Sequence, residues 1–109
     1  MSYQSRVNSL LVGAAIAGAA AMVAAQAQPN VKPTDGYVPN ANTAVVIGVA
    51  VLEPIYGEPS LARHKPYRAT LANGIWTVRG TLQPGAAGGT AVVEISKDDG
   101  RILRVFHEQ

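Results

Sequence analysis

The side chains that could carry out catalysis are few and scattered along the chain. The 109 residues include no cysteine, and the two histidines, His64 and His107, lie far apart in the sequence. Nucleophilic catalysis needs a serine, threonine or cysteine beside a base, and neither histidine belongs to a recognisable Ser–His–acid pattern. The absence of cysteine also excludes disulfides and a cysteine-rich zinc site. The sequence therefore predicts no catalytic residue and no enzyme activity.

Adjacent carboxylates and a glycine-rich segment are the remaining candidates for chemistry. Asp98 and Asp99 are neighbours, but adjacent residues of a strand or turn point apart, and the following Gly100 makes the pair typical of a turn. A calcium loop would need ligands at further positions that are absent here. The segment Gly85–Gly89 is not followed by the Lys-Ser or Lys-Thr of a phosphate-binding loop. We therefore expect no cofactor and no metal.

The first 27 residues predict an export signal. Arg6 precedes an uncharged stretch, Leu10–Val23, which is built almost wholly of small and aliphatic residues. This stretch of about 14 residues fits a secretory signal, whereas a membrane-spanning helix needs about 20. Ala25 and Ala27 are small residues suited to signal peptidase, so cleavage is expected after Ala27. The mature protein would then be periplasmic or secreted and free of the membrane; an uncleaved N-terminal anchor is the alternative.

Three segments lack a hydrophobic period and predict connections between elements. Residues 28–40, rich in proline and asparagine, are expected to form a flexible linker or arm before one domain over residues 41–109. Glu58–Pro66 and Gln83–Gly89 are expected to be loops within that domain. The nine lysines and arginines form no run, so nucleic acid is not an expected partner.

Apolar residues between 43 and 56 recur at helical spacing and predict one helix. The stripe consists of Ala44, Ile47, Val51, Leu52 and Ile55. The valines of this segment would also suit a strand, but the length, the spacing and a preceding cap residue, Asn40 or Asn42, favour a helix. Pro54 is expected to loosen the last turn because it lacks an N–H. Gly57 is expected to end the helix in a left-handed conformation.

After the helix, the hydrophobic period changes to two, which predicts strands. Asn73 and Gly74 are a strong signal for a two-residue hairpin turn, because both residues tolerate positive φ. This turn pairs Leu71 with Trp76 and predicts a return strand over Ile75–Leu82.

Two further strands are predicted over residues 90–96 and 101–107. A two-residue turn between them would set core residues opposite surface residues. A three-residue turn that ends at a left-handed Gly100 instead pairs Ile95 with Leu103, so that apolar residues face one another. We therefore predict the three-residue turn.

Together these elements predict an α+β fold in which one helix packs on a mostly antiparallel four-stranded sheet made of two hairpins. The helix stripe would cover the inner face of the sheet. The core residues expected on that face are Tyr67, Leu71, Trp76, Val78, Leu82, Val93, Ile95, Leu103 and Val105.

The outer face of this sheet is the most informative feature for function. The predicted register sets Glu94 opposite Arg104, an opposite-charge cross-strand contact. Arginine and aromatic residues, which protein interfaces favour, also lie on this face. It is predicted to bind a partner, although the N-terminal arm or a second copy of the chain would cover it equally well. Thr77 also lies on this face, and the candidate binding residues are Arg68, Ile75, Arg79, Val92, Glu94, Ile102, Arg104 and Phe106.

A family resemblance extends over residues 43–107. It rests on five segments in this order: Glu53-Pro54-Ile55-Tyr56-Gly57, Tyr67-Arg68-Ala69, Gly74–Leu82, Gly88-Gly89 and Glu94–Leu103. In this pattern the chain resembles a family of small bacterial immunity proteins with a nuclear-transport-factor-2-like fold. With a single helix, the chain would be a reduced version of that fold.

The resemblance implies an exported protein that binds a cognate bacterial toxin and blocks it sterically, with no reaction and no cofactor. The expected partner is therefore a protein, and a homodimer is possible. An alternative is a propeptide-like module that inhibits or chaperones a secreted peptidase. A third class, a hydrolase or isomerase, would need a polar group within a concave pocket, and the expected core offers only the polar tips of Tyr67 and Trp76.

Overall fold

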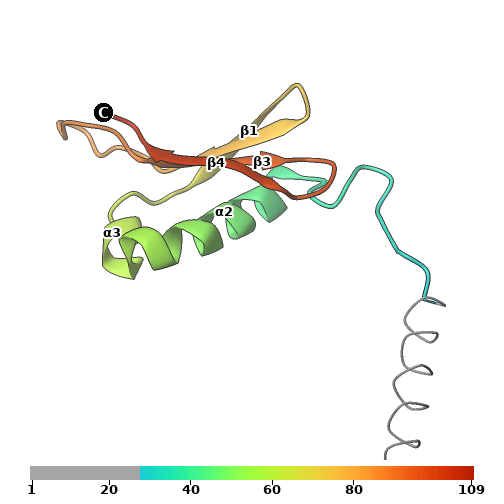
Figure 1. Ribbon diagram of the computed structural model, residues 1–109. Coiled ribbons are helices and arrows are strands. Elements are labelled where there is room, and N and C mark those ends of the chain that lie inside the picture. Colours follow the sequence, from blue (N-terminus) through green and yellow to red (C-terminus); the bar gives the residue numbers. More distant parts are fainter. Residues whose placement is uncertain (1–27) are drawn as a thin grey trace, which may run out of the picture. The chain divides into compact units, whose positions relative to one another are not determined.

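The structure describes residues 28–109, and the expected signal, residues 1–27, lies outside the described residues. In this computed structural model, the described part of the chain holds two helices followed by four strands (Figure 1). Lys32–Gln109 form one unit. Within the described range, no helix is both long enough and apolar enough to cross a membrane.

The main helix, α2, spans Ala41–Tyr56, close to the predicted range. Its cap is Asn40, whose side-chain Oδ1 accepts from the backbone N–H of Thr43 at 2.9 Å. This bond satisfies one of the N–H groups that a first helical turn leaves free. Pro54 lies inside the last turn, and Gly57 ends the helix with a positive φ of 83° but an extended ψ of 151°.

A short second helix, α3, covers Glu58–Ala62, where the sequence analysis expected only a loop. Pro59 lies in its first turn, a position where the missing N–H of proline costs nothing. The helix buries Leu61 in the core. Its five residues are too few for a hydrophobic period to be recognised in the sequence, so the prediction missed it.

The first hairpin confirms the predicted turn and register. Strands β1 (Arg68–Ala72) and β2 (Ile75–Arg79) pair antiparallel, with Leu71 opposite Trp76. Asn73 and Gly74 both have positive φ, 50° and 74°. The return strand ends at Arg79 rather than at Leu82, because the residues that follow Arg79 turn toward the segment after α3. There Thr81 N–H donates to the His64 carbonyl at 2.7 Å.

The second hairpin pairs β3 (Ala91–Ser96) with β4 (Ile102–His107), but its turn differs from the prediction. The Glu94–Arg104 pair is confirmed, whereas Ile95 lies opposite Ile102 and not opposite Leu103. The backbone N–H of Ser96 donates to the Arg101 carbonyl at 2.9 Å, so four residues, 97–100, form the loop. Leu103 is the extra residue of a β-bulge. Gly100 takes the expected positive φ of 76°.

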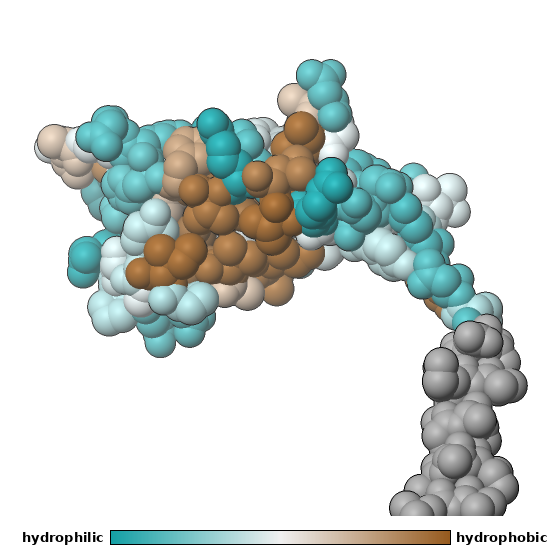
Figure 2. Space-filling model, in the orientation of Figure 1, coloured by the Kyte–Doolittle hydropathy of each residue, from teal (hydrophilic) through white to brown (hydrophobic). Residues whose placement is uncertain are grey.

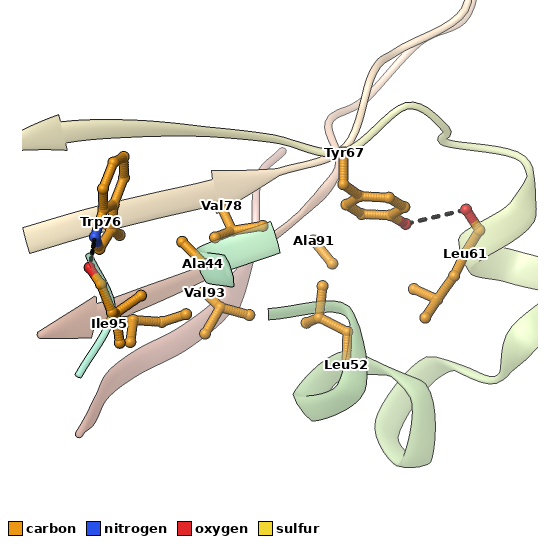
Figure 3. Packing of buried hydrophobic residues seen from close by; sticks show 10 residues of the cluster. Ala44, Leu52, Leu61, Tyr67, Trp76, Val78, Ala91, Val93 and Ile95 are labelled. Atoms are coloured by element: carbon orange, nitrogen blue, oxygen red, sulfur yellow. Dashed lines mark hydrogen bonds between the residues drawn. The ribbon is translucent and has the colours of Figure 1, made fainter. Parts of the chain in front are cut away.

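The sheet has the order β1-β2-β3-β4, with α2 on one face, here called the inner face (Figure 1). This is the predicted α+β arrangement of one main helix on a four-stranded antiparallel sheet. Ala44 and Leu52 of α2 pack with Val78, Val93 and other inward-facing strand residues in one buried cluster (Figure 3). Alternation along the strands thus directs one set of side chains to α2, as expected.

Three residues predicted for the core are instead exposed. Leu71, Leu82 and Leu103 have 47%, 37% and 38% of their surface exposed. Leu71 lies on an edge strand beside the hairpin turn, and Leu82 lies beyond the end of β2. Leu103 is displaced by the bulge. The alternation of side chains along the strands predicts more inward-facing apolar residues than helix α2 can cover.

The N-terminal arm enters the domain, which its proline-rich composition did not indicate. Val38 is completely buried, and the backbone N–H groups of Tyr37 and Val38 donate to the carbonyls of Asp98 and Lys97 at 2.9 and 3.0 Å. Lys32 forms an ion pair with Asp98 at 2.8 Å. Residues 32–38 are therefore fixed against the turn between β3 and β4, and they do not cover the outer face of the sheet.

Candidate functional site: the outer face of the sheet

Seven of the eight candidate binding residues share the outer face, the side of the sheet opposite α2. Cross-strand pairing forms them into rows. One row is Arg68, Arg79, Val92 and Phe106, the next is Thr70, Thr77, Glu94 and Arg104, and the last includes Ile75. Ile102 is the exception, because the bulge places it opposite the buried inner-face residue Ile95. Its assignment to the outer face is therefore wrong.

Val92 lies beneath this surface and not on it. Its side chain has no exposed area, although it points away from the α2 core. Its cross-strand neighbours are Arg79 and Phe106. The guanidinium of Arg79 also forms an ion pair with Glu108, with nitrogen–oxygen distances of 3.0 and 3.2 Å. Val92 thus supports the residues beside it and offers no atoms to a partner.

The guanidinium of Arg104 links two neighbouring residues of the outer face. It lies 4.1 Å from the centre of the Phe106 ring, a cation–π distance, and its Nε lies 3.3 Å from Glu94 Oε1. Exposed ion pairs of this kind stabilise a fold by only about 0–1 kcal/mol. Their main consequence here is orientation, since they hold the cation and the aromatic ring in one arrangement.

Arg68 gives the outer face an uncompensated positive charge. It lies directly opposite Arg79 on the neighbouring strand, and like charges in that position repel. Arg79 has Glu108 as its partner, whereas Arg68 makes no ion pair within residues 28–109. The face therefore carries three arginines, Arg68, Arg79 and Arg104, against the two glutamates that pair with the last two.

The other candidates for chemistry are separate from this face. His107 lies against Tyr56 of α2, with ring centres 5.9 Å apart, and its Nδ1 is 2.7 Å from the Glu108 carbonyl oxygen. His64 belongs to the turn that follows α3. Within residues 28–109, no three His, Cys, Asp or Glu side chains lie close enough together to hold a metal ion.

The two aspartates have structural roles in the turn between β3 and β4. Asp99 Oδ1 accepts from the Arg101 backbone N–H at 2.9 Å, and this bond lowers the pKa of the Asp99 carboxyl. Asp98 pairs with Lys32, and that hydrogen bond raises the pKa of the lysine. Beside this turn lies a hollow of about 230 Å³, lined by Thr34, Asp35, Gly36, Gly74, Lys97 and Asp98. Local sequence patterns do not reveal this hollow, because the arm forms one of its walls.

Buried polar side chains are few and each has a partner. The Tyr67 hydroxyl donates to the Leu61 carbonyl at 3.1 Å, and burial raises the pKa of this phenol. Trp76 Nε1 donates to the Val38 carbonyl at 2.8 Å (Figure 3). Among the described residues, no buried side-chain nitrogen or oxygen lacks a hydrogen-bond partner. The Tyr67 and Trp76 side chains therefore connect α3 and the N-terminal arm to the core by hydrogen bonds.

Comparison with known proteins places the chain in a family. Residues 43–109 match the family described as NTF2 fold immunity protein. The chain is also similar to the uncharacterized protein YhhH of Escherichia coli (strain K12), with 35% identity over 71 residues. That alignment covers 64% of this chain and 56% of the relative.

No solved structure matches the chain, and the propeptide-like alternative finds no support in these comparisons. Members of the matched family are generally non-catalytic. The match covers both helices in large part and all four strands, and the observed α+β arrangement agrees with it. On this evidence, the chain belongs to the NTF2 fold immunity protein family.

Proposed function

We propose that this protein neutralises a cognate bacterial toxin by binding it through the outer face of the sheet, without catalysing a reaction. The observation that carries this proposal is the oriented group formed by Arg79, Arg104 and Phe106. Arginines and aromatic residues held in place lose little conformational entropy on binding, which makes them suitable contacts for a protein partner.

The charge of the face indicates the chemistry of the partner surface. Arg68 makes no ion pair among the described residues and lies beside Arg79, so an acidic group of the partner would relieve the repulsion between the two guanidiniums. The Phe106 ring offers apolar contact in the same row. The toxin surface is therefore expected to combine carboxylates with an apolar side chain.

Export is a separate part of the proposal. Residues 1–27 have the composition of a signal peptide, which would deliver the protein to the periplasm, or out of the cell, and leave a mature chain beginning at Gln28. Intact mass of the protein recovered from the periplasmic fraction checks this. A periplasmic protein that retains Arg6 would contradict it.

Co-expression with the toxins encoded beside the gene tests the function. The unmodified protein should protect cells from one of them and bind it in pull-down. The double variant Arg79→Glu with Phe106→Ala should lose both protection and binding, because it reverses a charge and removes the ring. Circular dichroism must show that this variant is folded, since the same change uncovers Val92.

A matched control uses the opposite side of the molecule. Arg63 and Ile55 are exposed and belong to the helical layer, so Arg63→Glu with Ile55→Ala makes the same two kinds of change away from the outer face. This control should protect as well as the unmodified protein. Equal protection by the outer-face variant would show that the toxin binds elsewhere, and failure against every neighbouring toxin would contradict the function itself.

A further inference from the structure

Strand β4 is a free edge of the sheet that nothing in the described chain covers. It pairs with β3 on one side and with no strand on the other. Its six residues include no proline, and Arg104 is its one lysine or arginine. Folded proteins usually protect such an edge with proline, charge, a bulge or a covering segment, because its backbone groups can pair with another chain. Here the bulge at Leu103 disturbs one end alone.

The hydrogen-bond pattern shows which backbone groups of β4 face outward. Glu108 N–H donates to the Thr90 carbonyl at 3.0 Å. Residues of an antiparallel strand alternate between bonding the neighbour and pointing away from it. Glu108, Phe106 and Arg104 therefore direct their backbone groups to β3. Val105 and His107 present their N–H and C=O groups to the open edge.

The inner face above β4 is also uncovered. Helix α2 packs against β1, β2 and β3, and it approaches β4 through the ring contact of Tyr56 with His107. Val105 is half-buried, and Ile102 and Leu103 each have 38% of their surface exposed. Figure 2 shows the result as a continuous hydrophobic area over the helix and the adjoining sheet. Such an area on a small protein is typical of a contact surface.

We infer that β4 pairs antiparallel with β4 of a second copy, about a two-fold axis at Val105, to form one continuous eight-stranded sheet. In this register Val105 lies opposite the partner's Val105, and each exchanges the backbone hydrogen bonds that it now directs to the open edge. The two valine side chains meet on the inner face. On the outer face, Arg104 lies opposite Phe106 of the partner subunit, which repeats the cation–π contact already present within each chain.

Neighbouring registers are less favourable. An axis at Arg104 would set two guanidiniums directly opposite each other, which is repulsive. An axis at Phe106 would pair only Val105, Phe106 and His107 within β4. The axis at Val105 pairs residues 103–107 of β4. It sets valine opposite valine and a cation opposite an aromatic ring, with Leu103 opposite His107 of the partner subunit.

A second copy suits this edge because the strand is complementary to itself. In a two-fold contact the same surface serves both subunits, so one interface completes both open edges. The two outer faces would then join into one surface that carries two sets of Arg79, Arg104 and Phe106. The inference goes beyond the proposed function and holds whether or not a toxin is bound.

Disulfide trapping tests the register, since the chain has no cysteine of its own. The protein is expressed from its full coding sequence and purified with whatever N-terminal processing the cell performs. In a Val105→Cys variant, the two sulfurs would lie across the axis, where paired strands bring Cα atoms to about 5.5 Å, within the range that a disulfide spans. Leu71→Cys is the matched control, because Leu71 occupies the equivalent place on the opposite edge, β1.

The expected result is a dimer in sedimentation for the unmodified protein, and rapid covalent dimer formation by Val105→Cys but not by Leu71→Cys. Val105→Pro should reduce the sedimenting mass by half, because proline lacks the outward N–H. Leu71→Pro should stay dimeric. Circular dichroism checks folding; if Val105→Pro is unfolded, Val105→Lys replaces it, since this variant sets like charges across the axis.

Three results would overturn the inference. The first is a protein that sediments as a monomer at every concentration tested. A monomer whose β4 pairs with another chain only after a toxin is added would count as the same result. The second is cross-linking of Leu71→Cys as fast as that of Val105→Cys. The third is a folded Val105→Pro or Val105→Lys variant that remains dimeric.

Discussion

Trp76 and Val38, which are 38 residues apart in the chain, are joined by a hydrogen bond of 2.8 Å from the indole Nε1 to the backbone carbonyl. Val38 is completely buried and Trp76 is 7% exposed. The bond connects the arm that precedes α2 to the second strand of the sheet. It therefore makes residues 32–38 a part of the domain core and not a linker.

Trp76→Phe is expected to lower the free energy of unfolding by about 1–3 kcal/mol, because the buried Val38 carbonyl would lose its donor. Urea unfolding followed by circular dichroism measures this, since the substitution removes the single tryptophan of the chain. The amide protons of Tyr37 and Val38 should exchange faster with solvent, because the arm loses one of its attachments.

Tyr67→Phe is the comparison for this effect. It also removes a donor to a backbone carbonyl, that of Leu61, but at the other end of the core. It should lower stability by about 1 kcal/mol and leave the exchange of Tyr37 and Val38 unchanged. Faster arm exchange in both variants would mean that the arm responds to global stability and not to the Trp76 bond.

Gly48 allows α2 to lie directly on the sheet. A Cβ added there would lie 2.8 Å from Val78 Cγ1 and within 3.1 Å of the other side-chain carbons of Val78. Alanine normally stabilises a helix by about 1 kcal/mol relative to glycine. Here the overpacking, which costs about 1–3 kcal/mol, should exceed that gain, so Gly48→Ala is expected to destabilise the protein in urea unfolding.

A double-mutant cycle isolates the contact. In the Gly48→Ala background, Val78→Ala removes two of the three carbons that collide with the new methyl group, Cγ1 and Cγ2. It should therefore cost less there than in the unmodified protein. The variant Ala50→Gly measures the intrinsic helix preference of alanine over glycine, because Ala50 is an exposed position of the same helix. Additive effects of the two alanine substitutions would show that Gly48 and Val78 do not limit the approach of the helix.

Asp99 is expected to make stability depend on acid pH. Its pKa is lowered in the folded protein, mainly by the hydrogen bond from the Arg101 N–H. A lowered carboxyl pKa contributes stability above the ordinary pKa of an aspartate, and this contribution is lost as the pH falls through the folded-state value. Asp99→Asn keeps an acceptor oxygen but no charge. Urea unfolding at a series of pH values should therefore show a smaller loss of stability in acid for this variant.

Local patterns in the sequence predicted much of this fold. A helix cap at Asn40 or Asn42, the hairpin turn at Asn73 and Gly74, and the pairing of Leu71 with Trp76 were all predicted from residues near one another in the chain, and the structure shows Asn40 as the cap. The candidate outer face followed from the same alternation, and seven of its eight residues share that face. Such features depend on short-range backbone preferences, which a sequence expresses directly.

Features that depend on distant contacts were not predictable in this way. The bulge at Leu103 moved Ile102 off the outer face, and Val92 is buried under its cross-strand neighbours, so neither offers the contact that the sequence suggested. The sequence by itself determined the helix, the four strands and the side to which most residues point, because the helical and strand periods are local. Tertiary structure alone decided that the arm joins the core, because its attachment is a contact between residues as far apart in the sequence as Val38 and Trp76. It also decided that no other part of the described chain pairs with the outer edge of β4.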